Sequence, residues 1–155
     1  MIRPTVPSDT AALLAIAESI GFEPDECKVL SEMMTDYFSD NGDHIWLTDD
    51  DDGPVGVAYC APERMTNGTW NLLFIAIRPE YHGQGRGTSL IGHMEKLLKE
   101  RNARMLLVET LASFDQARAF YRKCGYEEEA QIRDFYDAGA DKIVYRKMLA
   151  ATSRY

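Results

Sequence analysis

Residues 75–88 read IAIRPEYHGQGRGT, the pattern of a strand, a glycine-rich loop and the start of a helix. Three glycines alternate with other residues in the loop, at Gly83, Gly85 and Gly87. Glycine lets the backbone approach a ligand closely and adopt positive φ angles. The unpaired N–H groups at the start of a helix, with the helix dipole behind them, bind phosphate well. The stretch therefore predicts a phosphate cradle at residues 82–88.

The spacing of these glycines excludes two common nucleotide motifs. A Walker loop needs Gly-Lys followed by Ser or Thr, and the chain has no such sequence. The dinucleotide pattern GxGxxG needs a glycine at position 88 when it begins at Gly83, but Thr88 stands there. When it begins at Gly85, the last position is Leu90. A bare connecting turn is the alternative to a cradle, and three alternating glycines suit it poorly.

The segments around this stretch predict an α+β, or mixed α/β, fold. The length fits one domain over residues 1–149, with a C-terminal tail over residues 150–155. The expected strands are residues 1–4, 44–49, 54–60, 69–77, 105–109, 131–136 and 142–148, and the expected helices are residues 9–20, 84–101, 115–124 and a segment that begins near Pro24. This order mixes hairpins with strand–helix–strand crossovers, which argues against a doubly wound sheet.

Two further predictions concern the first half of the chain. The second helix should turn one apolar stripe to the core, made of Val29, Leu30, Met33, Met34 and Tyr37. The four aspartates of residues 49–52, followed by Gly53, should form a solvated turn between two strands. A cation site is the alternative, but an EF-hand spreads its ligands over a twelve-residue loop.

The composition excludes several classes of protein. Seventeen basic and 25 acidic residues give a formal net charge of −8, whereas a nucleic-acid binder that tracks phosphates needs a basic face. No apolar run reaches the roughly 18–20 residues of a membrane span, and residues 1–4 lack the apolar stretch of a secretory signal. Three separated cysteines and three separated histidines indicate reduced thiols and no metal site. We therefore expect a cytoplasmic protein without a metal, nucleic-acid or membrane partner.

The glycine loop resembles the signature of the GNAT superfamily of acyl-CoA-dependent N-acetyltransferases. That signature is Arg or Gln, two residues, Gly, one residue, and then Gly or Ala. Its two glycines fall on Gly85 and Gly87, and its first position holds His82 in place of Arg or Gln. The backbone cradle does not depend on that side chain, so the departure concerns only a side-chain contact.

Further motifs extend the resemblance over about residues 2–149. The opening Ile2-Arg3-Pro4 with Asp9 is similar to a family start. An acid on the next strand, a helix with Ala-x-x-aromatic-Tyr and a closing Gly-aromatic pair correspond to Glu109, Ala117, Phe120-Tyr121 and Gly125-Tyr126. Phe114 stands where many relatives carry Asn, so no polar cofactor contact is expected there. The resemblance implies a single-domain GNAT-like fold, with a central mixed, mostly antiparallel sheet of about seven strands flanked by about four helices.

The activity that the resemblance implies is acetyl transfer from acetyl-CoA, the cosubstrate, to a primary amine, by direct attack through a tetrahedral intermediate. An alkyl ammonium must lose a proton before it attacks, and the departing thiolate gains from a proton donor. On the family's pattern, Glu109 is the candidate base, acting through water, and Tyr121 is the candidate acid. Glu63 is the competing base. A backbone N–H within residues 75–77 would stabilise the oxyanion.

Ten residues form the implied cofactor site. They are Ile75, Ala76, Ile77, His82, Gly83, Gln84, Gly85, Arg86, Gly87 and Thr88. A regulatory or sensor module that binds CoA without catalysis is the alternative function, and the presence of both Glu109 and Tyr121 favours the enzyme. Members of the superfamily often form dimers, so the resemblance is also compatible with a homodimer.

The acceptor remains open between a small metabolite, a polyamine-like compound, an antibiotic, and a peptide or protein amine. Its pocket should involve residues 20–40, the loop at residues 60–70 and the final hairpin around residues 135–136. These regions contain the aromatic residues Phe22, Tyr37, Phe38, Trp70 and Tyr136. Aromatic faces in an acidic surround suit a cationic amine, but the same side chains would also serve as the core and its cover.

Overall fold

The computed structural model of the chain describes residues 1–40 and 42–150. Its contacts divide the chain into two compact units. Unit 1 comprises residues 1–61 and 74–96, and unit 2 comprises residues 62–73 and the chain from Leu97 onward. Apart from Ala150, the predicted C-terminal tail lies outside the described residues.

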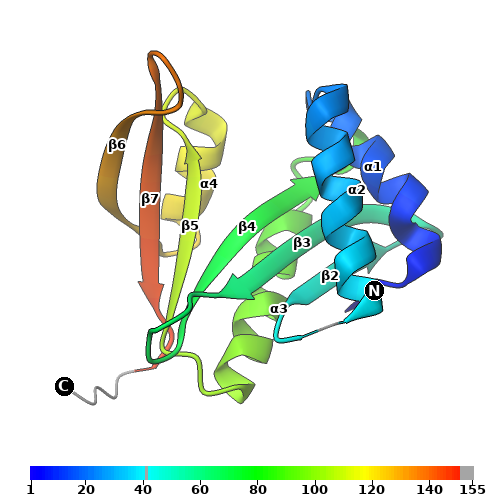
Figure 1. Cartoon of the computed structure of the whole chain (residues 1–155), viewed down its shortest axis with the longest axis horizontal. Coiled ribbons are helices and arrows are strands. Elements are labelled where there is room, and N and C mark those ends of the chain that lie inside the picture. Colours follow the sequence, from blue (N-terminus) through cyan, green and yellow to red (C-terminus); the bar gives the residue numbers. More distant parts are fainter. Residues whose placement is uncertain (41, 151–155) are drawn as a thin grey trace. The chain divides into compact units, whose positions relative to one another are not determined.

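The strands and helices follow one another along the chain in the predicted order (Figure 1). The strands are β1 (Ile2–Pro4), β2 (Ile45–Asp50), β3 (Pro54–Pro62), β4 (Thr69–Ile77), β5 (Met105–Leu111), β6 (Glu127–Asp137) and β7 (Ala140–Met148). The helices are α1 (Thr10–Ser19), α2 (Pro24–Ser39), α3 (Arg86–Glu100) and α4 (Asp115–Lys123), with short 3-10 helices at Pro7–Asp9 and Pro79–Tyr81.

The strands form one seven-stranded sheet in the order β1-β2-β3-β4-β5-β7-β6. The pairs β1–β2, β2–β3, β5–β7 and β6–β7 are antiparallel, and β4–β5 is parallel. The predicted mixed, mostly antiparallel sheet of seven strands with four helices is therefore confirmed. Within the described residues, no helix is long and apolar enough to cross a membrane.

In unit 1, helices α1 and α2 pack against β2 and β3. The core of this unit contains Leu13 and Ile16 from α1, Leu30 and Met34 from α2, and Trp46, Val57 and Tyr59 from the two strands. The predicted stripe of α2 needs one correction, because Val29 is 55% exposed and Cys27 is buried in its place. Positions 27, 30 and 34 follow the three- and four-residue spacing of one helical face, and position 29 falls outside it.

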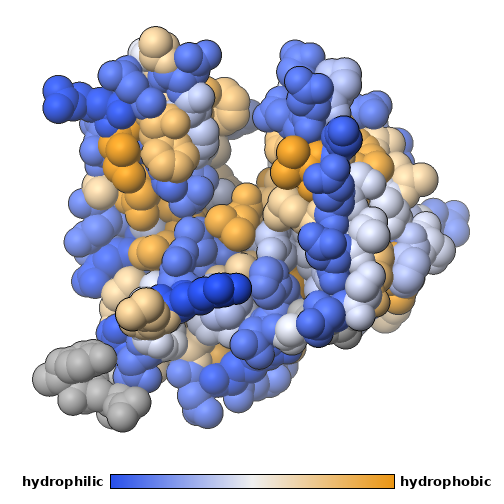
Figure 2. Space-filling model, in the orientation of Figure 1, coloured by the Kyte–Doolittle hydropathy of each residue, from blue (hydrophilic) through white to orange (hydrophobic). Residues whose placement is uncertain are grey.

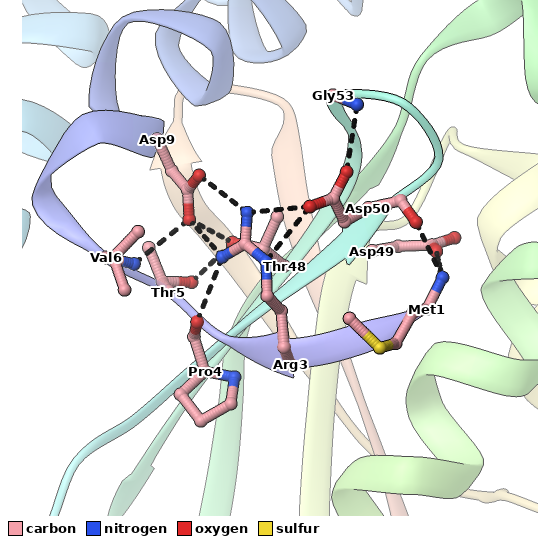
Figure 3. Close-up of polar contacts among 10 residues, drawn as sticks. All are labelled: Met1, Arg3, Pro4, Thr5, Val6, Asp9, Thr48, Asp49, Asp50 and Gly53. Atoms are coloured by element: carbon pink, nitrogen blue, oxygen red, sulfur yellow. Dashed lines mark hydrogen bonds and ion pairs between the residues drawn. The ribbon is translucent and has the colours of Figure 1, made fainter.

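The prediction of a solvated turn at the aspartate run is wrong for its first two residues. Strand β2 includes Asp49, as the expected strand 44–49 does, but it continues to Asp50, and Asp49 is buried. Figure 3 shows Arg3 between Asp9 and Asp50: its two Nη atoms lie 2.8 and 2.9 Å from the Asp9 carboxylate oxygens, and its Nε lies 3.1 Å from Asp50 Oδ2. The other oxygen of Asp50 accepts the N–H of Gly53 at 2.9 Å. Carboxylates can be buried here because arginine side chains and backbone N–H groups meet them.

In unit 2, the first residues of β4 pair with β5, and β7 lies between β5 and β6. The buried residues of the sheet in this unit include Leu106, Val108, Ile143 and Tyr145. The ring of Tyr145 packs against that of Tyr121 on α4. Strand β6 is exposed along its whole length and begins four residues earlier than predicted. Figure 2 shows apolar side chains reaching the surface over the hairpin of β6 and β7, where Ile132 and Phe135 are 43% and 50% exposed.

Candidate active site

The glycine loop of unit 1 has the local geometry of a cradle. It follows β4 and the short helix Pro79–Tyr81, and α3 begins at Arg86. Gly83 and Gly85 have φ angles of +76° and +78°, in the left-handed region that favours glycine. A Cβ added to either residue would meet nothing within 4 Å, so the space above both is open.

The N–H groups at the start of α3 complete this cradle. The N–H of Ser89 donates to the carbonyl of Gly85 at 3.0 Å, the first bond of the helical ladder. The N–H groups of the first helical turn precede that bond and have no carbonyl one turn back to receive them. Such groups, together with the open space at Gly83 and Gly85, fit a phosphate ligand. The assignment of the ten cofactor-binding residues therefore stays a prediction, and the backbone of the loop is suitable for binding a phosphate.

Two side chains of the loop are held by the protein itself. His82 Nε2 donates to the carbonyl oxygen of Ile77 at 2.7 Å. Arg86 Nη1 lies 3.1 and 3.2 Å from the two oxygens of Asp49, and its Nη2 lies 2.5 Å from Asp51. The hydrogen bonds that Arg86 donates to Asp49 raise the pKa of Arg86 above its usual value. Because its guanidinium is paired with Asp49 and Asp51, any contact of Arg86 with the predicted cofactor would be made by its backbone N–H.

A row of polar side chains crosses adjacent strands in unit 2. Asn71 lies on β4, Glu109 on β5 and Lys142 on β7. Asn71 pairs with Leu107 and Val144 with Glu109, so the three polar residues are diagonal neighbours on one face of the sheet. Glu109 was expected to end its strand, but β5 continues to Leu111 and the carboxylate lies within the sheet.

The polar row is connected by short contacts. Lys142 Nζ lies 2.8 Å from Glu109 Oε2, and the two side chains are 11% and 19% exposed. Asn71 Nδ2 donates to the same Glu109 oxygen at 3.3 Å and to Glu63 Oε1 at 3.2 Å. The two base candidates are thus joined through one amide. A carboxylate within a sheet is tolerated when it is hydrogen-bonded and paired, as Glu109 is.

Tyr121, the candidate acid, lies on α4 in unit 2 and is 6% exposed. Its ring contacts those of Tyr126 and Tyr145, with centroids 6.1 and 5.7 Å away. Burial raises its pKa well above the usual tyrosine value, and the charge of Glu109 adds to the effect. Burial and the same carboxylate raise the pKa of Tyr136 to about 12. Both phenols therefore hold their protons at neutral pH.

Most of the aromatic residues expected at the acceptor pocket pack inside their own unit. Phe22 contacts Phe74 at 5.2 Å, and Tyr37 contacts both Phe38 and Trp46. In unit 2, Trp70 is 7% exposed and lies under the guanidinium of Arg101. These contacts favour a role in the core and its cover over a role in a pocket for a cationic amine. Tyr136 differs, because 46% of it is exposed.

Asn71 and Lys142 were not among the residues predicted from the sequence. Asn71 carried a usable signal, because it is the one polar residue between Trp70 and Ile77 in an apolar strand. Lys142 carried none, since a lysine in a terminal strand is ordinary at the surface. Among the described residues, no group of three or more His, Cys, Asp and Glu is arranged to hold a metal ion.

Comparisons with known proteins agree with this geometry. The model of the Acetyltransferase (GNAT) family matches residues 11–126. N-alpha-acetyltransferase 30 of Schizosaccharomyces pombe is 28% identical over 125 residues, which are 76% of this chain and 83% of that protein. The ribosomal protein bS18-alanine N-acetyltransferase of Escherichia coli is 34% identical over 76 residues, 47% of this chain and only 51% of that relative.

A solved structure matches the fold of this protein over almost the whole length of the chain. The crystal structure of a GNAT protein from Desulfovibrio desulfuricans has a TM-score of 0.90 at 29% identity and covers 97% of this chain and 99% of its own. The family match extends over well more than half of the chain and includes the glycine loop at the start of α3. The protein therefore belongs to the GNAT family of acetyltransferases.

Proposed function

We propose that the protein transfers an acetyl group from acetyl-CoA to the α-amino group at the start of a peptide or protein. The observation that carries this proposal is the polar row of unit 2, in which a carboxylate on β5 is held by Asn71 and Lys142. The names of the two relatives above, an N-alpha- and an alanine N-acetyltransferase, support the same class of acceptor.

The glycine loop is the proposed cosubstrate site. The N–H groups of residues 83–88 would bind the phosphates of acetyl-CoA, and a backbone N–H within residues 75–77 would polarise the acetyl carbonyl. Acetyl-CoA supplies the thioester-activated acetyl group and a thiolate that leaves. No side-chain cation of the loop is needed for this binding, since Arg86 is paired with Asp49 and Asp51.

The proton transfers are assigned to unit 2. An α-amino group has a pKa of about 7.7–8.0, against about 10.4 for lysine. A sizeable fraction of the α-amine is therefore already unprotonated at physiological pH, whereas lysine is almost fully charged. A carboxylate is a weak base, and it suits the more acidic of these two ammonium groups. Glu109 would take the proton through a water molecule, and the amine would then attack the acetyl carbon. Tyr121, which stays protonated at neutral pH, would return a proton to the departing sulfur.

The test compares acceptor amines in the presence of acetyl-CoA. The panel contains four acceptors. They are a peptide that begins with alanine, a version of that peptide with a formylated α-amine and an added internal lysine, a polyamine, and an aminoglycoside. Released thiol gives the rate, and mass spectrometry locates the acetyl group. We expect transfer to the alanine α-amine and almost none to the blocked peptide.

Each other outcome has a definite meaning. Transfer confined to the lysine, the polyamine or the aminoglycoside contradicts the proposed acceptor. Thermal stabilisation by acetyl-CoA without thiol release from any amine favours a CoA-binding module without catalysis.

A further inference from the structure

Asn71 is a buried amide with one half of its hydrogen-bonding capacity unused. The residue is 7% exposed and stands between the buried Trp70 and Leu72 on β4. Its Nδ2 donates to Glu63 and Glu109, but its Oδ1 is buried without a hydrogen-bond partner among the described residues. The reverse orientation of the amide would set its oxygen against two carboxylates. The chemistry of its neighbours therefore fixes which way Asn71 points.

A buried carbonyl oxygen without a partner is costly, and an apolar residue of similar size would avoid the cost. Asn71 nevertheless interrupts an otherwise apolar strand. Such groups recur where a ligand completes the hydrogen bonding. The unused oxygen is closed to solvent in this structure, so it indicates a hydrogen-bond donor that reaches this position once a neighbouring side chain moves aside.

The charges around Asn71 indicate the kind of donor. Glu63 and Glu109 carry two negative charges, and Lys142 supplies one positive charge. Lys142 is already committed to Glu109 Oε2, and its Nζ lies 4.0 Å from the centre of the Phe135 ring. Together, Glu63, Glu109 and Lys142 carry one negative charge in excess. This charge and the unused acceptor oxygen of Asn71 suit an ammonium group with three N–H donors.

We propose that Asn71 is a positioning residue for the acetyl transfer and that its Oδ1 binds an N–H of the acceptor amine. This inference rests on the proposed function. Its Nδ2 orients the carboxylates of Glu63 and Glu109, and its Oδ1 holds the amine before and after the amine loses its proton. One proton of the ammonium passes to the Glu109 carboxylate. The neutral amine keeps two N–H groups, of which one donates to Asn71, and its lone pair attacks the acetyl carbon. As the carbon–sulfur bond breaks, the sulfur leaves with the proton of Tyr121, and the nitrogen gives up one further proton, which restores the Tyr121 phenol and leaves an amide with one N–H. Asn71 itself gains and loses no proton.

The first test measures binding without turnover. Calorimetry compares a peptide with a primary α-amine and the same peptide N-acetylated, each titrated into protein saturated with CoA. The wild type should bind the amine at least about tenfold more tightly, as expected for a hydrogen bond to a charged group. Asn71→Leu, which keeps the number and branching of the side-chain heavy atoms and removes both polar atoms, should lose this preference. An equal preference in both proteins would overturn the proposal.

The second test measures kinetics and pH dependence. Asn71→Leu should lower kcat/KM for the peptide by at least about tenfold and leave the KM for acetyl-CoA unchanged. Asn71→Asp places a third carboxylate beside Glu63 and Glu109, so the acid limb of kcat/KM should move to higher pH. Movement of the pH profile would show that position 71 lies beside the titrating carboxylate, and the rate of Asn71→Leu then tests the role of the polar atoms of Asn71. Unchanged rates and profiles in both variants would also overturn the proposal.

A matched control separates a local role from a loss of stability. Thr110→Val replaces another buried polar residue, the next residue along β5 from Glu109, with an isosteric apolar one. This control should keep the amine preference, the rate and the pH profile. An equal loss of rate and preference in Thr110→Val would assign the effect to packing and contradict the proposal. If the wild type transfers to no peptide, the proposed function fails, while the binding comparison still decides the role of Asn71.

Discussion

Glu109 interrupts the apolar run of β5, and its surroundings explain why that is tolerated. Lys142 and Asn71 meet the same oxygen of its carboxylate, at 2.8 and 3.3 Å. The same amide reaches Glu63 at 3.2 Å, so the two acids considered as rival bases belong to one hydrogen-bonded group. A substitution at either acid should therefore disturb the other. Double-mutant cycles, rather than single variants, are the appropriate measure of their roles.

Replacing Tyr121 with phenylalanine tests the proposed acid. Tyr121→Phe should lower kcat by about 100-fold, because the departing sulfur loses its proton donor. The affinity for acetyl-CoA should hardly change. Tyr145→Phe is the matched control, since Tyr145 is also buried, contacts the Tyr121 ring and bonds Arg118 through its hydroxyl. A rate in Tyr121→Phe equal to that of the control would remove Tyr121 from the mechanism.

Single residues of the site were predictable where one strand or one loop carried the signal. Glu109 stands out in an apolar run, and Gly83, Gly85 and Gly87 stand out by their alternation. The contact between Asn71 and Glu109 joins positions 38 residues apart. It depends on the register of β4 against β5, which no local pattern of the sequence specifies. For the same reason the partnership of Asp49 with Arg86 was missed, and the aspartates were interpreted as a solvated turn.

The loop between β4 and α3 can be tested as an element. Gly85→Ala should weaken acetyl-CoA binding by at least about tenfold, because a methyl group enters the space left for the ligand and the φ angle of +78° becomes strained. The free energy of unfolding should fall slightly, by about 1 kcal/mol. Isothermal titration and thermal unfolding measure the two effects.

Gly139→Ala provides the control for backbone strain. Gly139 has a φ angle of +77° and equally open space, but it lies in the turn between β6 and β7. The two alanine variants should lose similar stability, and only Gly85→Ala should lose affinity for acetyl-CoA. Equal affinities in both variants would contradict the assignment of the cradle.

Elements were predicted well where one face is buried and poorly where neither is. Strand β4 was expected at residues 69–77 and has those bounds. Strand β6 was expected at residues 131–136 but extends over Glu127–Asp137. Both faces of β6 are exposed, so its first residues lack the alternation that marks a strand. Its backbone hydrogen bonds to β7 hold it in the sheet, and those depend on the partner strand.

At the scale of the whole molecule, the polar cluster of Arg3, Asp9 and Asp50 ties the start of the chain to β2 (Figure 3). The hydrogen bonds from Arg3 hold the pKa of Asp9 below its ordinary value. Because the folded pKa is the lower one, this stabilisation is fully present above about pH 4 and is lost as the pH falls through the folded pKa. We therefore expect the contribution of Asp9 to the stability of the wild type to decline below about pH 4.

Asp9→Asn should remove that contribution at every pH. At neutral pH the free energy of unfolding should fall by roughly 2 kcal/mol, the range for hydrogen bonds to a charged group. The difference from the wild type should shrink as both proteins are acidified. Urea unfolding at a series of pH values measures it. Asp52→Asn removes the same charge from an exposed position and should change little, so a pH-independent difference for Asp9→Asn would contradict the argument.

The order of elements and the fold class followed from the sequence, because hydrophobic periodicity and turn residues mark each segment. The division into two compact units did not. The boundary falls inside β4, between Leu73 and Phe74, and inside α3, between Lys96 and Leu97. Neither point shows a change of composition or a linker-like stretch. Such a boundary is defined by which contacts form, and the sequence alone does not display them.

The pairing of Arg86 with Asp49 and Asp51 has a consequence for ionic strength. Arg86 is the one arginine or lysine of residues 82–88, and its charge is already neutralised. The attraction for phosphate is then left to backbone N–H dipoles in direct contact with the ligand, and dissolved salt screens mainly over distances of about 8 Å or more. Calorimetric titration in dilute and concentrated potassium chloride should give nearly the same acetyl-CoA affinity. A steep loss in concentrated salt would mean that a distant cation attracts the cosubstrate.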